Sequence, residues 1–188
     1  AAQEREAIER PRDLSFALDQ LLASPLGERI DTRRIVAAGH SYGANTTLLA
    51  AGARVQREGR RVDLHDERLR AAVLLSAPPF YGEADASRIL GAVQVPTLHV
   101  TATGDVIRIP GYYSGAEDRI AVFEATGSAA KALAVFDGGS HSMFTDRSGA
   151  GGRDLNPLVK VATIDLTLAF FEEILGGTKG CLALRSAG

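Results

Sequence analysis

The segment Gly39-His40-Ser41-Tyr42-Gly43 has the pattern G-x-S-x-G and joins two stretches of different character. The apolar run at 34–38 before it predicts a short strand, and residues 44–51 after it predict a helix. A serine in so tight a strand-to-helix turn is strained, and its hydroxyl stands clear above the sheet, as in a nucleophile elbow. We therefore interpret Ser41 as a nucleophile; the alternative is a structural turn that contains serine by chance.

The neighbours of Ser41 support this interpretation. Gly39 and Gly43 have no Cβ atom, so the predicted strand and helix can approach each other closely. Tyr42 would be the first residue of the helix, where a backbone N–H has no partner within the helix. Because that N–H can face an oxyanion that forms next to Ser41, Tyr42 is the predicted oxyanion donor.

Length and composition favour one globular domain over residues 1–188. The chain is 45% hydrophobic and 23% charged, and its net charge of −2 gives no electrostatic reason to expect a nucleic acid or a membrane as partner. No transmembrane run or signal peptide is recognisable. The single cysteine, Cys181, excludes an intrachain disulfide and leaves the redox compartment undetermined. A cytoplasmic location is slightly favoured, although a chain that starts at Ala1 is compatible with a lost upstream leader.

Four continuous apolar runs predict buried strands, with helical patterns between them. Because apolar and polar residues do not alternate within these runs, we expect a mostly parallel sheet covered by helices on both faces, a three-layer α/β architecture. The predicted strands are residues 34–38, 71–76, 95–101 and 131–136, and the predicted helices are 12–23, 44–56, 85–90 and 157–175.

The remaining segments are predicted as connections. Pro11 is expected to interrupt the first helical pattern, and residues 57–67 to form a polar connection. Residues 117–125 fit either a helix or an extended segment, a Gly-rich loop is expected at 147–152, and the tail at 176–188 is expected to be loosely held.

Three reactive side chains follow predicted strands: Ser41 after the first, Asp105 after the third and His141 after the fourth. The carboxyl ends of parallel strands share one edge of a sheet, so these side chains are expected to meet there. The order Ser, Asp, His is the one expected when an elbow serine comes first. His141 would accept the proton of Ser41 and return it to the leaving group, while Asp105 would orient and stabilise the imidazole.

Each of these residues has an ordinary structural alternative. Asp105 could belong to a simple Gly-Asp turn, and His141 could be an exposed loop histidine. Asp137 is a competing carboxylate, but four residues before His141 it is expected to close a turn. The other histidines, His40, His65 and His99, are interpreted as structural or solvated. No metal or cofactor is predicted, because the donors at 65–67 are consecutive and no second cluster accompanies them.

With these three residues in place, the chain resembles the α/β-hydrolase superfamily over roughly residues 10–175. The segments 10–13, 30–31 and 39–43 are similar to bacterial proteins called predicted dienelactone hydrolases, which are related to platelet-activating-factor acetylhydrolases. Gly138-Gly139-Ser140-His141-Ser142-Met143-Phe144 resembles the histidine loop of the same group.

The chain also departs from this pattern. True dienelactone hydrolases use a cysteine nucleophile, so lactone specificity is not carried over to Ser41. The acetylhydrolases carry their acid after the strand that follows the elbow, but here that strand ends at Ser76, and the acid role passes to Asp105.

The resemblance further implies about four strands before the elbow, where this chain has one predicted helix. We therefore expect the sequence to be the C-terminal portion of the fold, with the Tyr42 N–H as the one identifiable oxyanion donor. The elbow strand would then lie at an open sheet edge, which predicts a homodimer or aggregation.

The expected activity is hydrolysis of a small-molecule carboxylic ester through an acyl-enzyme intermediate. The segment 77–84 is too short for a large lid, which favours small or protruding esters. Two alternatives remain: a non-catalytic binding or scaffolding protein of the same fold, and acyl transfer to an alcohol or amine. Six residues are candidates for the wall of a substrate pocket: Phe80, Tyr81, Tyr112, Tyr113, Met143 and Phe144.

Overall fold

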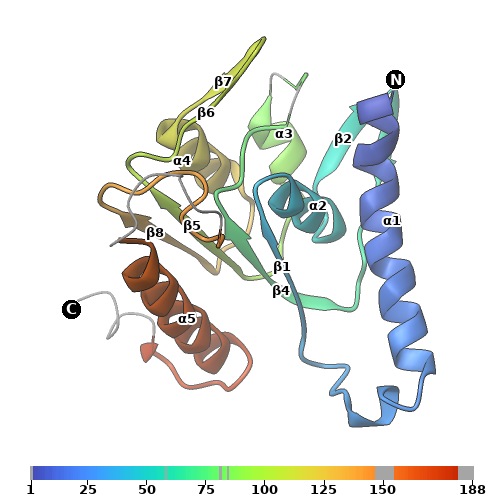
Figure 1. The fold of residues 1–188 in the computed structure, drawn as a ribbon. Helices are drawn as coiled ribbons and strands as arrows, with labels where there is room; N and C mark the ends of the chain where they lie inside the picture. The colour runs from blue at the N-terminus through green and yellow to red at the C-terminus, as the bar shows by residue number, and fades with distance from the viewer. Residues whose placement is uncertain (1, 58, 81, 84, 147–154, 182–188) are drawn as a thin grey trace.

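Four strands form one parallel sheet, with the strand of the elbow at one edge (Figure 1). The computed structural model describes residues 2–57, 59–80, 82–83, 85–146 and 155–181. The strand order is β1-β4-β5-β8, and the bounds are Ile35–His40 for β1, Leu69–Leu75 for β4, Thr97–Ala102 for β5 and Lys131–Phe136 for β8. The four predicted strands are therefore confirmed, with ends shifted by at most two residues.

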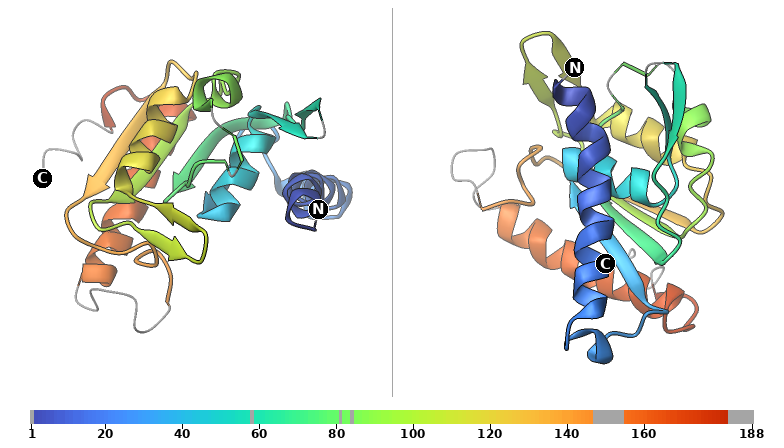
Figure 2. Two further views of the ribbon diagram at one scale, coloured as in Figure 1. Left: turned by 90° about the horizontal axis from the view of Figure 1, so that it is seen from above. Right: turned by 90° about the vertical axis from the view of Figure 1, so that its right-hand side faces the viewer.

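Helices cover both faces of this sheet. Alternate residues of β4 point to opposite faces, so Leu74 joins the same apolar cluster as Leu48 of α2, whereas Val73 joins Phe170 of α5. The helices are α1 (Ala2–Ala23), α2 (Tyr42–Ala50), α3 (Ala86–Leu90), α4 (Ala116–Ala125) and α5 (Leu155–Ile174), with a short 3₁₀ turn, η1, at Gly27–Arg29. Seen from above, α1 stands at the opposite end of the molecule from β8 (Figure 2).

Two antiparallel hairpins were not predicted from the sequence. The first, β2 (Arg54–Arg57) with β3 (Arg60–Asp63), occupies the region predicted as the end of a helix and a polar connection. The prediction that the elbow helix reaches residue 56 is wrong, because α2 ends at Ala50 and the chain turns at Gly52 with φ +115°. The second hairpin, β6 (Ile107–Ile109) with β7 (Tyr112–Ser114), directly follows Asp105.

The remaining segments include one further correction. Pro11 does not interrupt the first helix: its ring is buried and α1 continues through it. The open assignment of 117–125 is resolved as helix α4. The predicted Gly-rich loop at 147–152 and residues 182–188 of the predicted loose tail lie outside the described residues. Among the described helices, none is long and apolar enough to cross a membrane.

A polar cluster, the α1 anchor, ties α1 to the chain just before β4. Asp66 accepts a hydrogen bond from Ser15 Oγ at 2.8 Å and two from the guanidinium of Arg68, at 2.8 and 2.6 Å. Arg68 also contacts Asp19, one turn further along α1. The Arg68 hydrogen bonds are the main reason that the pKa of Asp66 is lowered to about 2. The α1 anchor thus fixes α1 to the chain before β4, and Leu14 of α1 packs with Ile35 and Ala37 of the edge strand β1.

Candidate active site

Ser41 lies in the turn between β1 and α2 with φ 55° and ψ −124°. Its backbone N–H donates to the Leu75 carbonyl at 2.9 Å, which extends the pairing of β1 with β4 by one residue. A Cβ atom on Gly39 would come within 2.2 Å of the Gly43 carbonyl oxygen, so the turn requires glycine there. A Cβ on Gly43 would meet nothing within 4 Å, so the expected close approach is wrong for this glycine.

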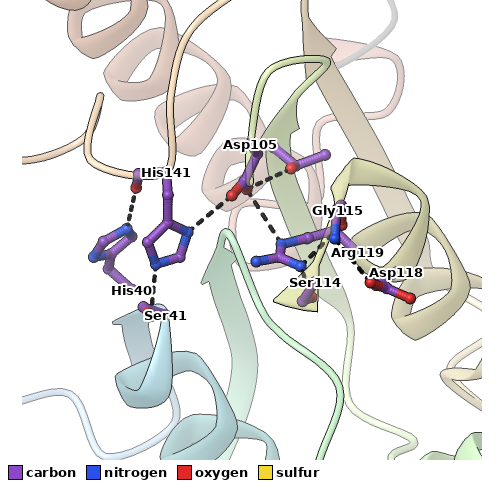
Figure 3. Close-up of polar contacts among 9 residues, drawn as sticks. His40, Ser41, Asp105, Ser114, Gly115, Asp118, Arg119 and His141 are labelled. Carbon is purple, nitrogen blue, oxygen red and sulfur yellow. Dashed lines mark hydrogen bonds and ion pairs between the residues drawn. The ribbon is translucent and has the colours of Figure 1, made fainter. Parts of the chain in front are cut away.

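The structure brings Ser41, His141 and Asp105 into one hydrogen-bonded line (Figure 3). Ser41 Oγ is 2.7 Å from His141 Nε2, and His141 Nδ1 is 2.8 Å from Asp105 Oδ1. A carboxylate only accepts hydrogen bonds, so Nδ1 donates to Asp105 and leaves Nε2 to accept the Ser41 proton. This is the tautomer that a histidine general base needs.

The loops that carry Asp105 and His141 are locked together. Gly138 N–H donates to Thr103 Oγ1 at 2.8 Å, and Thr103 Oγ1 in turn donates to Asp137 at 3.2 Å. A Cβ atom on Gly104 would come within 2.2 Å of the Gly139 carbonyl oxygen, so the two loops are in backbone contact. Asp137 therefore ties the two loops together and does not contact His141 through any of the described hydrogen bonds.

Asp105 has no solvent-exposed side-chain surface. Its Oδ1 contacts His141, while its Oδ2 accepts from Thr101 Oγ1 at 2.8 Å and lies 3.4 Å from Nε of Arg119. Burial alone would raise the pKa of Asp105, but the hydrogen bond with His141, the Ser76 hydroxyl, the charge of Arg119 and the Thr101 hydroxyl, in that order, outweigh it and hold the pKa at about 2. Asp105 is therefore ionised at neutral pH.

Two residues of the site were not predicted from the sequence. His40 Nε2 is 2.8 Å from the His141 carbonyl oxygen, to which it must donate, and the two rings lie 4.9 Å apart. From the sequence, His40 was interpreted as structural or solvated. Its position inside the elbow motif, next to Ser41, could have indicated that it lies at the site. Arg119 lies 14 positions from Asp105 in a helix of mixed charge, and no spacing rule connects the two residues.

The other two histidines lie away from this line of hydrogen bonds. His65 is exposed in the loop before β4. His99 is buried in β5 with its ring edge-on to Phe123 at 5.3 Å, and burial, helped by the charge of Lys131, lowers its pKa to about 3. His99 is therefore a neutral core residue. Among the described residues, no three His, Cys, Asp or Glu side chains are grouped as metal ligands would be.

Tyr42 is the first residue of α2, so its N–H is one of those that the helix cannot pair with its own carbonyls. This N–H lies at the positive end of the helix dipole and belongs to the residue next to Ser41. The guanidinium of Arg10 in α1 sits 4.8 Å from the centre of the Tyr42 ring. The helix fixed by the α1 anchor thus also touches the residue predicted as oxyanion donor.

The residues predicted as a pocket wall are scattered. Phe80 is buried in the core beneath α2 and α3, and Tyr113 is exposed on β7. Met143 is buried against Ala102 and Val159. Tyr112 is half-buried on β7, whereas Tyr81 lies outside the described residues. Phe144 lies at the site, with its ring 5.8 Å from that of His40.

No protein-family profile matches the chain, and no curated protein matches its sequence significantly. Solved structures do match. Acylaminoacyl peptidase from Pyrococcus horikoshii matches with a TM-score of 0.64 and 17% identity, over 92% of this chain and 29% of that one. The esterase Pf2001 from Pyrococcus furiosus matches with a TM-score of 0.57 and 13% identity, over 86% and 61%. A cold-adapted esterase from an Arctic intertidal metagenomic library has a TM-score of 0.46 and 20% identity, over 71% and 50%.

The chain thus spans between 29% and 61% of the length of these structures. At such low identity the likeness concerns the fold. Taken with the parallel sheet and the helices on both of its faces, the two stronger matches show that the chain has the α/β-hydrolase fold.

Proposed function

We propose that the protein is a serine hydrolase that cleaves carboxylic esters through an acyl-enzyme intermediate. The observation that carries the proposal is the line of hydrogen bonds from Ser41 Oγ through His141 to Asp105, at 2.7 and 2.8 Å. A scaffold has no need of a strained serine, a correctly tautomeric imidazole and a buried carboxylate in one line.

The reaction follows from this geometry. His141 Nε2 accepts the Ser41 proton as Oγ bonds to the ester carbonyl carbon, and the carbonyl oxygen becomes an oxyanion facing the Tyr42 N–H. The imidazolium, stabilised by Asp105, then gives its proton to the departing alkoxide, which leaves an acyl group on Ser41. Water activated by His141 releases the acid and restores the serine.

The substrate class is proposed on narrower grounds. The connection from β4 to α3 is short, from residue 76 to 85, which leaves little chain to form a lid over Ser41. We favour small or protruding esters, with Phe144 as an apolar side chain beside His40 at the site. The closer kinship to predicted dienelactone hydrolases is part of this proposal and rests on the sequence segments around Ser41 and His141.

The test is covalent labelling followed by turnover. A fluorophosphonate should add one phosphonyl group to Ser41, detected by mass spectrometry, and Ser41→Ala should abolish the adduct. Short p-nitrophenyl esters should then be hydrolysed by the wild type and not by Ser41→Ala. An unlabelled wild type, or an adduct that survives the substitution, would favour a binding or scaffolding role. Adding an alcohol or amine acceptor to the assay distinguishes acyl transfer from hydrolysis.

A further inference from the structure

Arg119 is a buried cation in an unfavourable position. Its side chain is 2% exposed, and it is the fourth residue of α4. Burial in a low-dielectric interior disfavours a charged group, and the positive end of the helix dipole disfavours a cation. A nearby anion is needed to offset both costs, so the surroundings of the guanidinium decide what it does.

Local contacts fix the direction of the guanidinium without neutralising it. Nη1 donates to the Gly115 carbonyl at 2.9 Å and to Ser114 Oγ, both just before α4 (Figure 3). Asp118 is turned to the Gly115 N–H, which it accepts at 2.8 Å, and this contact sets the first turn of the helix. Nε and Nη2 have no hydrogen-bond partner in the described part of the chain. The ion pair of Nε with Asp105, at 3.4 Å, is therefore the contact that compensates the charge.

The two oxygens of Asp105 are divided between two cations of the catalytic cycle. Oδ2 faces Arg119 permanently, whereas Oδ1 faces His141, which becomes positive only during the reaction. Among the described residues, Arg119 from α4 and His141 from the loop after β8 are the charged or titratable side chains in contact with Asp105. Thr101 Oγ1 donates to Oδ2 at 2.8 Å, and the neutral hydroxyl of Ser76 also helps to lower the pKa of Asp105.

We propose that Arg119 is a positioning residue of the active site: its buried charge keeps Asp105 ionised with Oδ1 directed at His141, and so extends activity to lower pH. This inference rests on the proposed ester hydrolysis. Arg119 touches no reacting atom and acts through Asp105.

The sign of the pH effect follows from charge. The active form holds a neutral His141 beside a charged Asp105, and adding one proton to this pair inactivates the base. A fixed positive charge at Arg119 opposes that added proton, so it moves the acid limb of the pH–rate profile to lower pH. Removing the charge should move the midpoint of the limb upward, by about one pH unit at an effective dielectric near 20.

The experiment compares pH profiles of kcat/KM for Arg119→Met, Arg119→Gln and Arg119→Lys, each corrected for active fraction by fluorophosphonate titration. We expect the two neutral variants to shift the acid limb upward by about one unit with a roughly tenfold lower plateau. The lysine variant keeps a positive charge but lacks the planar guanidinium. The acid limb of its pH profile should therefore stay near the wild-type position, while its pH-independent kcat/KM falls. Two neutral variants are used so that one remains if the other does not fold.

Arg68→Met is the matched control, because it removes the arginine of the α1 anchor and leaves Arg119 in place. Its limb should coincide with that of the wild type. The inference would be overturned if Arg119→Met or Arg119→Gln were active with the acid limb of its pH profile at the wild-type position. It would also be overturned if the acid limb of Arg119→Lys moved as far as those of the neutral variants. In both cases the proposed function would still stand. If neither neutral variant folds, a lysine variant with a wild-type limb supports the inference and a shifted one overturns it. A wild type without esterase activity overturns both proposals.

Discussion

Asp66 and Asp105 are both buried, both contact an arginine, and both have a pKa lowered to about 2. They differ in how their oxygens are used. Nε and Nη2 of Arg68 each donate a hydrogen bond to one oxygen of Asp66, and Ser15 Oγ donates another to Oδ2. Arg119 approaches one oxygen of Asp105 from 3.4 Å and leaves the other to His141.

The difference separates a structural carboxylate from one that is available for chemistry. Asp66 is saturated by its arginine, so it can only hold α1 against the chain before β4. Asp105 keeps one oxygen for a partner whose charge changes, and its arginine is too far away to compete for that oxygen. A lowered pKa does not distinguish the two roles, since both aspartates show it; the sharing of oxygens does.

The largest expected effect comes from exchanging carboxylate for amide at the two positions. Asp105→Asn should lower kcat by about 10⁴-fold, because the amide no longer holds His141 in the tautomer that accepts the Ser41 proton. Asp66→Asn, the same change in the α1 anchor, should leave kcat within a factor of about two. Both are measured with one p-nitrophenyl ester under saturating conditions. Comparable activity losses in the two variants would mean that the division of roles is wrong.

The second effect concerns stability in acid. The folded-state pKa of Asp66, about 2, lies below its ordinary value of 3.8, so its carboxylate stabilises the folded state above about pH 4, and this contribution is lost as the pH falls toward 2. The difference of roughly two pKa units corresponds to about 2 kcal/mol. Urea unfolding of the wild type and Asp66→Asn should therefore differ by about that free energy at pH 7, and the difference should shrink below pH 4 and vanish only at about pH 2 and below.

Asp31→Asn is the control for this measurement. Asp31 also has a lowered pKa, chiefly through its hydrogen bonds with Arg33, but it is on the surface, where water screens the pair. Its loss should change the free energy of unfolding little at any pH. Parallel stability curves for the wild type and Asp66→Asn would show that the α1 anchor does not stabilise the fold through its charge.

The elbow and the sheet could be predicted from sequence because their signals are local. A continuous apolar run, a Gly-x-Ser-x-Gly turn and a following helix each lie within about ten residues. Ser41, Asp105 and His141 follow the ends of the first, third and fourth predicted strands, which placed these side chains at one edge of the sheet, and the structure brings them together there. The β2–β3 hairpin was missed although it had a signal, since Gly52 follows the helix and Gly59 lies at the turn between the two strands.

Arg119 could not have been found in this way. It follows Glu117 and Asp118 on a helix of mixed charge, a pattern typical of a solvated helix face, and yet it is buried. Its contact with Asp105 depends on how α4 packs beside β5, which one sequence does not encode in any spacing. Two of the predicted pocket residues show a related difficulty: Phe80 is buried in the core and Tyr113 is exposed to solvent, which an aromatic residue near a strand end does not reveal in the sequence.

The smallest expected effect concerns His40, which lies beside the Ser41–His141–Asp105 line. Its ring contacts the backbone carbonyl of His141 and not the reactive ring nitrogens of that residue. His40→Ala removes the hydrogen bond to the His141 carbonyl, and a neutral hydrogen bond contributes about 1 kcal/mol, so kcat should fall by about fivefold with KM nearly unchanged. His40→Gln keeps an N–H donor and should recover part of the loss, whereas His65→Ala, at an exposed histidine, should have no effect. A wild-type kcat in His40→Ala would show that the loop contacts of Gly138 and Thr103 suffice to hold His141, and that the elbow contributes to its position only through Ser41.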